Sequence, residues 1–238
     1  MNETFSRTEL LIGEEGLKRL RKARVAVFGV GGVGGYAVEA LARSGVGHFL
    51  LVDNDVVGES NLNRQIIALR STLGRYKTMV MKERIADICP ETQTETRECF
   101  FLPEHADQFD FREFDYVVDA IDTVSGKLEL AVRCQEAGTP LISAMGAGNK
   151  LDPSRFQVTD IYSTRACPLA KVMRRELRRR GVERLKVVYS TEEPRTPLQQ
   201  ILGGDGRKVT PGSMVFVPGT AGLLLASEVV KDLLSQQG

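Results

Sequence analysis

A glycine-rich turn between an apolar segment and a helix-like segment limits the possible folds more than any other feature of the sequence. The turn, residues 29–34 (Gly-Val-Gly-Gly-Val-Gly), ends the apolar run Arg24–Val30 and opens the helix-like segment Val33–Ser44. A second apolar run, His48–Val52, follows and ends at Asp53. These parts fit within about 30 residues, the length of one βαβ unit, whose crossover is nearly always right-handed. The segment therefore predicts two parallel strands with a helix packed across them.

The same alternation of apolar runs and helix-like segments extends to about residue 148. A short helix is expected before the unit, at Glu14–Lys22. The later elements are expected as helices at Lys77–Ile88 and Gly126–Ala137 and as strands at Thr92–Glu98, Tyr116–Ile121 and Pro140–Met145. Such alternation is typical of a largely parallel sheet with helices on both faces.

After Gly148 the character of the sequence changes. We expect a strand at Arg155–Ile161, a helix at Leu169–Arg180, a strand at Leu185–Ser190 and a long loop at Thr191–Gly212. The predicted fold is α/β, a Rossmann-like, mostly parallel sheet with a smaller C-terminal α/β extension. We interpret residues 1–148 as the nucleotide-binding core and residues 149–238 as a substrate-binding extension. The extension is not expected to fold independently, so residues 1–238 are predicted to form a single domain.

Charge and cysteine content narrow the possible classes of protein. The 32 basic and 31 acidic side chains nearly cancel, so any affinity for nucleic acid must come from a local patch. The apolar stretch Met214–Val230 is interrupted at Pro218 and Gly219, which favours a buried helix entered through a Pro-Gly turn over a membrane span. The four cysteines include no close pair, which is typical of reduced thiols in a cytoplasmic protein. No membrane partner is expected.

The glycine turn also indicates a ligand. Between a strand and a helix, its backbone N–H groups and the helix dipole converge where phosphate or ribose oxygens can bind. Asp53, about 20 residues further on, stands where an acid accepts hydrogen bonds from ribose hydroxyls. Gly-x-Gly-x-x-Gly alone is weak evidence, because any tight turn of this kind needs glycines. To this point a nicotinamide-dependent oxidoreductase fits as well as an ATP-binding enzyme.

The residues after Asp53 favour a triphosphate. Arg64 can grip phosphate oxygens with its planar guanidinium, Lys77 can place a point charge on the same group, and Asn61 can hydrogen-bond the bridging region. Hydride transfer has little need for such a set. Each residue also has a purely structural interpretation: Arg64 as a solvated surface residue, Lys77 as a charge at a helix start and Asn61 as a helix cap.

Together these residues resemble the adenylation core that ubiquitin-activating enzymes share with bacterial activators of sulphur-carrier proteins. The resemblance covers about Phe5 to Gly148, and its motifs are the glycine turn, Asp53–Asp55, Ser60–Gln65, Lys77 and Asp119–Asp122. It implies that Mg²⁺ and ATP bind and that a carboxylate attacks the α-phosphorus, giving an acyl-adenylate and pyrophosphate. The residues that it implies for nucleotide binding are Gly29, Gly31, Gly32, Gly34, Asp53, Asp55, Asn61, Arg64 and Lys77.

Two further residues take roles from this resemblance. Asp122 is expected to coordinate Mg²⁺, which prefers oxygen ligands, although Asp122-Thr123-Val124-Ser125 also has the form of a helix N-cap. Arg7 stands where family members supply an arginine from the amino-terminal segment of a second subunit, which implies a homodimer. The predicted catalytic set is therefore Arg64, Lys77, Asp122 and Arg7.

The number and spacing of the cysteines help to decide whether the activated carboxylate belongs to a carrier protein. Activators of carrier proteins usually have paired Cys-x-x-Cys motifs for a structural zinc, and this sequence has none. Cys167, at an expected helix start, is the one candidate nucleophile, and inert packing is the alternative interpretation. ATP-dependent adenylation of the C-terminus of a small ubiquitin-like sulphur-carrier protein stays open as a second hypothesis.

The second half of the chain resembles a distinct branch, the tRNA threonylcarbamoyladenosine dehydratases. The segments that carry this resemblance are Asp152–Ile161, Pro168–Lys171, the arginine-rich helix that follows, and Val187–Glu192. The branch implies that the partner is tRNA carrying a modified adenosine. It also implies that ATP activates the threonyl carboxylate of this adenosine and that an atom of the neighbouring carbamoyl group then closes a ring. Tethering supplies a high effective molarity, so no cysteine is needed. A cysteine desulphurase or sulphur-acceptor protein is a further partner that the family implies.

The arginine-rich helix is the local basic patch that the balanced net charge conceals. Lys171, Arg174 and Arg178 fall on one helical face, with Arg175 and Arg179 beside them, so several tRNA phosphates can be neutralised together. A solvated helix face is the alternative. We favour tRNA because like charges three or four residues apart weaken a helix unless a partner compensates. The nearby candidates for stacking on RNA bases are Phe156, Tyr162 and Tyr189.

Overall fold

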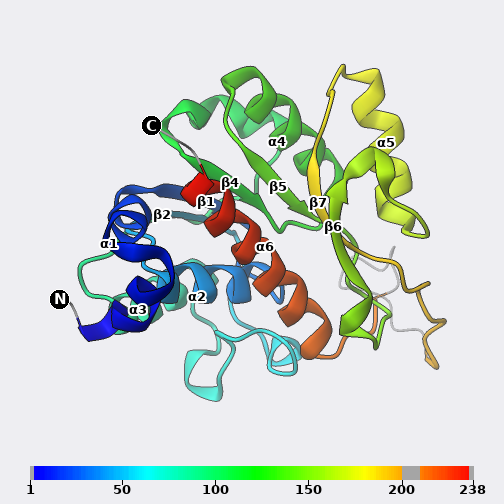
Figure 1. Ribbon diagram of the computed structural model, residues 1–238. Helices are drawn as coiled ribbons and strands as arrows, with labels where there is room; N and C mark the ends of the chain where they lie inside the picture. The colour runs from blue at the N-terminus through cyan, green and yellow to red at the C-terminus, as the bar shows by residue number, and fades with distance from the viewer. Residues whose placement is uncertain (1–2, 200–209, 236–238) are drawn as a thin grey trace.

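A seven-stranded sheet forms the centre of the molecule in the computed structural model, which describes residues 3–199 and 210–235 (Figure 1). The strand order is β3-β2-β1-β4-β5-β7-β6. Neighbouring strands are parallel except for β6 and β7, which are antiparallel. The strands are β1 (Arg24–Phe28), β2 (His48–Val52), β3 (Gln93–Arg97), β4 (Tyr116–Asp119), β5 (Leu141–Ala144), β6 (Phe156–Asp160) and β7 (Lys186–Ser190). The predicted α/β fold with a mostly parallel sheet is confirmed.

Helices cover both faces of this sheet. Against one face lie α1 (Ser6–Lys22), α2 (Gly34–Ser44), α3 (Lys77–Ile88) and α6 (Phe216–Ser235), and Figure 1 shows α6 crossing that face in the foreground. Against the other face lie α4 (Val124–Ala137) and α5 (Pro168–Arg179), which contact each other. The short 3₁₀ helices are η1 (Glu3–Phe5), η2 (Glu59–Asn61), η3 (Arg70–Thr72), η4 (Pro103–Gln108), η5 (Phe111–Glu113), η6 (Pro153–Arg155) and η7 (Ile161–Ser163).

Alternation along β1 explains why its sequence is a continuous apolar run. Val25 and Val27 belong to the core beneath α2 and α6, whereas Ala26 and Phe28 belong to the core on the opposite face. All four side chains are fully buried. A parallel strand with both faces covered must be apolar at every position, so the run itself indicated a central strand.

The strand order places a crevice at the carboxyl end of β1. From β1 the chain proceeds outward to β2 and β3, then returns to pair β4 on the other side of β1. In open α/β sheets, ligands bind at such a reversal of strand order, outside the carboxyl ends of the strands. The turn after β1, Asp53 after β2 and Ala120 after β4 therefore meet at one edge of the sheet.

Two sequence predictions need correction at their boundaries, whereas the loop predicted at Thr191–Gly212 agrees with the residues described there. The first helix extends back to Ser6, with a break at Gly13, whose φ of 73° is left-handed. Pro218 and Gly219 lie inside the first turn of α6 and do not form a turn before it, because proline is tolerated in the first turn of a helix. The loop predicted at Thr191–Gly212 contains no helix or strand at 191–199 and 210–212, and its residues 200–209 lie outside the described part of the chain.

The apolar C-terminal stretch does not form a membrane span. Among residues 3–199 and 210–235, none of the helices combines the length and the apolar character that crossing a bilayer requires. The stretch instead forms α6, whose buried residues pack against α2 and the sheet.

Candidate active site

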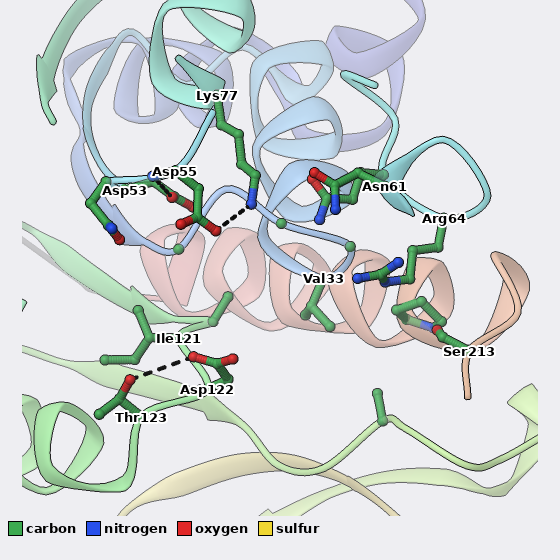
Figure 2. A pocket seen from close by; sticks show the side chains of 18 of the residues that line it. Val33, Asp53, Asp55, Asn61, Arg64, Lys77, Ile121, Asp122, Thr123 and Ser213 are labelled. Carbon is green, nitrogen blue, oxygen red and sulfur yellow. Dashed lines mark hydrogen bonds and ion pairs between the residues drawn. The ribbon is translucent and has the colours of Figure 1, made fainter. Parts of the chain in front are cut away.

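A cavity of about 640 Å³ opens at the carboxyl ends of β1, β2 and β4. Its walls come from the glycine turn, the loop after β2, the start of α3, the loop after β4 and residues 210–213. Figure 2 shows Asn61, Arg64 and Lys77 gathered along one side and Asp122 across the cavity from them. The sequence-predicted nucleotide and phosphate residues are thus brought to one place, although they come from separate segments.

The glycines of the turn meet two different requirements. Gly29 has a φ of 90°, and a Cβ there would lie 2.7 Å from the Ala120 carbonyl oxygen. A Cβ on Gly34 would lie 1.8 Å from the Gly29 carbonyl oxygen, so these two glycines are needed by the fold itself. A Cβ on Gly31 or Gly32 would make only ordinary van der Waals contacts, with nearest atoms 3.7 and 3.4 Å away.

The bare backbone at Gly31 and Gly32 therefore serves something other than internal packing. Neither residue donates a backbone hydrogen bond to the rest of residues 3–199 and 210–235. Both line the cavity at the start of α2, where free N–H groups and the helix dipole favour an anion. The turn thus offers donors to a ligand that approaches the backbone closely.

Asp53 is fixed by the same turn. Its Oδ2 accepts a hydrogen bond from the Val30 N–H at 2.7 Å, and its Oδ1 accepts one from the Asp55 N–H at 2.9 Å. A carboxylate has about four acceptor positions, so two remain after these backbone contacts. Asp53 lines the cavity with its carboxylate held in place, as ribose recognition requires.

Lys77 is a buried cation at the cavity wall. The residue is only 5% exposed, and its Nζ lies 2.7 Å from Asp55 Oδ2. Its backbone N–H also donates to the Asp55 carbonyl oxygen. An ordinary charge at a helix start faces water, so this burial argues against the purely structural interpretation of Lys77. Asp55 orients the ammonium group, as Figure 2 shows.

Asn61 and Arg64 combine structural contacts with groups left for a ligand. Asn61 Oδ1 accepts a hydrogen bond from the Gly58 N–H at 3.0 Å, so the helix-cap interpretation is correct for that oxygen, while the amide nitrogen stays available. Arg64 Nη1 donates to the Ser60 carbonyl oxygen at 2.8 Å and to Asn63 Oδ1 at 3.1 Å. Arg64 Nε and Nη2 have no partner in the described part of the chain, and the side chain lines the cavity.

Gln65 is a cavity residue that sequence reasoning did not single out. It is 6% exposed, and its buried Oε1 has no hydrogen-bond partner among residues 3–199 and 210–235. A buried polar atom without a partner is costly, so such atoms usually meet a ligand or water. Its position after Arg64 in Ser60–Gln65 was the available signal.

Asp122 does not cap α4. The N-cap residue is Thr123, without a side-chain capping bond, and among residues 3–199 and 210–235 the Asp122 carboxylate accepts a hydrogen bond only from the Thr123 hydroxyl, at 3.5 Å. The oxygen atoms of Asp122 are therefore left to face the cavity. Within the described residues, no group of three or more His, Cys, Asp or Glu side chains forms a metal site. Mg²⁺ is commonly held by one or two carboxylates together with substrate phosphates, and Asp122 fits that mode.

A buried ion pair between Lys127 and Asp119 lies next to the loop that carries Asp122. Lys127 Nζ is 3.0 Å from both carboxylate oxygens of Asp119 and 2.7 Å from the Ala144 carbonyl oxygen. Asp119 also accepts from the Ile121 N–H at 3.2 Å, which fixes the loop leading to Asp122. Lys127 is not recognisable as a buried residue from the sequence. Its helical position one residue before the buried Leu128 was the only signal, because burial of a lysine depends on tertiary contacts.

Arg7 lies away from this cavity. It is exposed on α1 and does not line the cavity of its own chain. Leu10 and Leu11, on the same helix, are 87% and 88% exposed. Two large apolar side chains at the surface beside Arg7 form a patch of the kind that marks protein–protein contacts.

The positive charge of the basic helix α5 is partly neutralised by Glu176, an acidic residue of the same helix. Glu176 accepts hydrogen bonds from Arg175 at 2.9 Å, Arg179 at 3.2 Å and Arg180 at 3.0 Å. The bonds from Arg180 and Arg175 hold the pKa of the Glu176 carboxyl below its usual value. The chain thus supplies part of the compensating charge that was expected from an external partner. Charge spacing alone therefore does not establish tRNA binding.

Other members of the predicted tRNA patch make contacts on the same side of the sheet. Arg174 is half-buried and donates to the Thr164 carbonyl oxygen at 3.1 Å, and the Arg178 guanidinium lies 5.0 Å from the Tyr162 ring centroid. Lys171 is exposed, and its ammonium group makes no hydrogen bond or ion pair with residues 3–199 or 210–235. Phe156 and Tyr189 are 9% and 3% exposed, so their proposal as base-stacking residues is wrong.

The cysteines do not form a reactive centre in the described structure. All four are free thiols. Cys167 is 4% exposed, packs in the core beneath α5 and does not line the cavity, which favours the packing interpretation. Cys99 lines the cavity, but burial raises the pKa of its thiol and keeps it protonated.

Comparison with known proteins gives a consistent set of similarities. The ThiF family matches residues 5–237. The chain is 48% identical over 243 residues to tRNA threonylcarbamoyladenosine dehydratase of Bacillus subtilis (strain 168), covering 98% of this chain and 96% of the relative. The structure is similar to E. coli tRNA N6-threonylcarbamoyladenosine dehydratase, TcdA, in complex with AMP (TM-score 0.89, 36% identity, covering 98% of this chain and 95% of that chain). It is similarly close to TcdA in complex with ATP (TM-score 0.89, 35% identity, covering 99% and 97%).

Proposed function

The chain belongs to the ThiF family, and from that premise we propose that it is an ATP-dependent tRNA threonylcarbamoyladenosine dehydratase. The observation that carries the proposal is the cavity, in which a glycine turn with free N–H groups faces Arg64, Lys77 and Asp122. ATP and AMP are bound by TcdA, whose fold this chain shares over nearly its full length. Activation of a sulphur-carrier protein is the second hypothesis, and the residues described give it little support: they contain no group of three or more His, Cys, Asp or Glu that could hold zinc, and Cys167 is buried in the core.

The proposed reaction has two steps. An oxygen of the threonyl carboxylate attacks the α-phosphorus of ATP, a P–O bond to the β-phosphate breaks, and pyrophosphate leaves. An atom of the neighbouring carbamoyl group then attacks the activated carbonyl carbon, and AMP leaves with the former carboxylate oxygen. The modified adenosine has then lost one water. The attacking group is already tethered to the electrophile, so the protein need only orient it.

The cavity residues are proposed to divide this work. Gly31, Gly32 and Asp53 hold the nucleotide, while Gly29 and Gly34 shape the turn that presents it. Arg64, Lys77 and Asn61 stabilise the negative charge that grows on phosphate oxygens, and Asp55 holds the Lys77 ammonium in place. Preset cations of this kind stabilise the transition state more than the ground state. Asp122 is the residue proposed to hold Mg²⁺, which would neutralise charge on the phosphates.

We propose that tRNA lies over α5 with the help of its remaining positive charge. The helix carries five basic side chains and one acidic one, so Glu176 leaves most of the charge uncompensated. Lys171 is exposed in the amino-terminal half of the helix, and Arg175, Arg178 and Arg179 are exposed in the other half. The Cβ position of Gly146, one residue before the cavity wall, lies 3.9 Å from Cys167 at the start of α5. The basic helix thus begins beside the cavity.

A homodimer is proposed to complete the site through Arg7. The arginine does not reach the cavity of its own chain, and exposed Leu10 and Leu11 beside it offer an apolar contact. A cysteine desulphurase or sulphur-acceptor partner rests on the family resemblance alone and stays a prediction. A cytoplasmic location accords with the tRNA substrate and the free thiols.

We also propose that residues 1–238 act as one domain. Strand β7 pairs β5 within the same sheet, and α6 packs along α2 of the core. Separating residues 149–238 would remove two strands from that sheet and expose the buried side of α6.

The proposed function is tested by the dependence of AMP formation on the modified nucleoside. The protein with Mg²⁺ and ATP should release AMP and pyrophosphate with tRNA that carries threonylcarbamoyladenosine, and not with the same tRNA lacking the modification. Arg64→Ala and Lys77→Ala should each slow this reaction roughly a hundred- to a thousandfold. Lys82→Ala, at an exposed position of α3, is the matched control and should retain full activity. Equal AMP release with both tRNAs would contradict the proposal.

A further inference from the structure

Residues 210–213, called the wall segment below, form one side of the cavity. Thr210, Pro211 and Ser213 all line it, although they are distant in sequence from the glycine turn and the phosphate residues. The wall segment leads directly into α6, which begins at Phe216. The position of the wall segment therefore sets the shape of the cavity on the side of the C-terminal extension.

Asn149 holds the wall segment from the extension. The Asn149 N–H donates to the Gly212 carbonyl oxygen at 2.8 Å, and the Gly212 N–H donates to Asn149 Oδ1 at 2.7 Å. Asn149 has a left-handed φ of 59°, which asparagine tolerates better than most residues. A Cβ on Gly148 would lie 2.8 Å from Pro211 Cβ, so the two segments approach closely.

Asn63 holds the wall segment from the phosphate side. Its Nδ2 donates to the Ser213 carbonyl oxygen at 3.0 Å. Its Oδ1 accepts from Arg64 Nη1 at 3.1 Å. Asparagine carries a donor and an acceptor on one rigid amide, so both bonds depend on one orientation of the group. Figure 2 places Arg64 and Ser213 next to each other at the same end of the cavity.

We propose that Asn63 is a positioning residue that couples ATP binding at Arg64 to the placement of the wall segment. Bound phosphate holds the Arg64 guanidinium through its free Nε and Nη2, while Nη1 keeps the Asn63 oxygen in place. The amide nitrogen of Asn63 is then held toward Ser213. Bound triphosphate thereby strengthens the hold of Asn63 on the cavity wall next to the extension. The inference rests on the proposed ATP site.

Hydrogen exchange of the full-length protein tests this coupling without tRNA. The measured quantity is the exchange rate of a peptide covering residues 210–216, with and without saturating ATP and Mg²⁺. In the wild-type protein ATP should slow this exchange about three- to tenfold, the effect of one net hydrogen bond. In Asn63→Ala, which loses both bonds, ATP should leave the rate unchanged once the site is saturated.

Two further variants distinguish the ATP-dependent coupling from a change that makes residues 210–216 exchange faster whether or not ATP is bound. Asn63→Asp still accepts from Arg64 but cannot donate to Ser213, so it should bind ATP and yet lose the protection of residues 210–216. Asn149→Gly keeps a left-handed backbone accessible and removes the side-chain acceptor for Gly212. It should raise the exchange rate without ATP and still show slowing by ATP.

The outcomes distinguish the coupling from the ATP site. Protection of residues 210–216 by ATP in Asn63→Asp, equal to that in the wild type, would overturn the role of Asn63. Protection of the glycine turn without protection of residues 210–216 in the wild type would also overturn it and leave the ATP site intact. If ATP protects neither segment in the wild type, the ATP site and the coupling are both wrong.

Discussion

Replacing Lys127 with methionine should cost more stability than any comparable change at a surface lysine. The Lys127 ammonium is 1% exposed and contacts both oxygens of Asp119, the Ser143 hydroxyl and the Ala144 carbonyl oxygen. Methionine has a similar length and helix propensity, so the change removes mainly the charge and its hydrogen bonds. It leaves the Asp119 carboxylate, 0% exposed, without a counter-ion.

The expected loss is about 3–5 kcal/mol, the usual cost of removing one partner of a buried ion pair. That is a large share of the roughly 5–15 kcal/mol by which domains are stable, so the variant should unfold at a much lower urea concentration. Urea denaturation followed by circular dichroism gives the free energy of unfolding. Lys82→Met, at an exposed position of α3 on the opposite face of the sheet, is the control and should change stability by less than about 0.5 kcal/mol.

A double variant identifies the cause of the loss. Asp119→Asn removes the uncompensated charge yet keeps an oxygen to accept from the Ile121 N–H. Lys127→Met with Asp119→Asn should therefore regain most of the stability that Lys127→Met loses. A loss below about 1 kcal/mol in Lys127→Met, or no recovery in the double variant, would refute the account of this buried pair.

Three other predictions concern the turn, the packing of α2 and the proposed homodimer. Gly34→Ala should prevent stable folding because its Cβ meets the Gly29 carbonyl oxygen, whereas Gly31→Ala should fold normally and lose ATP affinity, as thermal unfolding and calorimetry would show. Burial alone would raise the pKa of Glu39, but hydrogen bonds from Arg84 and Arg43 lower it below 4.5. The stabilisation that the Glu39 carboxylate contributes is therefore present above about pH 4.5 and is lost as the pH falls through the folded-state pKa. On lowering the pH from about 5 to about 3, the free energy of unfolding should fall less in Glu39→Gln than in the wild type. Leu11→Asp should shift the protein to monomer in light scattering and abolish AMP formation; an unchanged dimer would exclude this surface.

Much of the fold was predictable because its signals are local. The apolar run of β1, the glycine turn and Asp53 lie within one βαβ unit, and the rule for strand-order reversals places them at one crevice. That Arg64 and Lys77 lie at this crevice was predictable from residue type and from their position after Asp53. Their supporting contacts were not, since the Lys77–Asp55 ion pair depends on how the loop returns to α3.

The features that the sequence did not reveal depend on contacts between distant segments. Lys127 has the local appearance of a solvated helix residue, and only the packing of α4 on β4 and β5 buries it. The bond from Asn63 to Ser213 joins residues 150 positions apart. On α5 the sequence did show Glu176, but its three arginine contacts depend on rotamers that spacing does not specify.

Nucleoside analysis tests the central claim most directly. The protein is incubated with Mg²⁺, ATP and tRNA that carries threonylcarbamoyladenosine, and the digested tRNA is analysed by mass spectrometry. The predicted result is conversion to a nucleoside lighter by one water, dependent on ATP and absent in Arg64→Ala. An unchanged nucleoside, together with ATP–pyrophosphate exchange that requires a sulphur-carrier protein, would contradict the account.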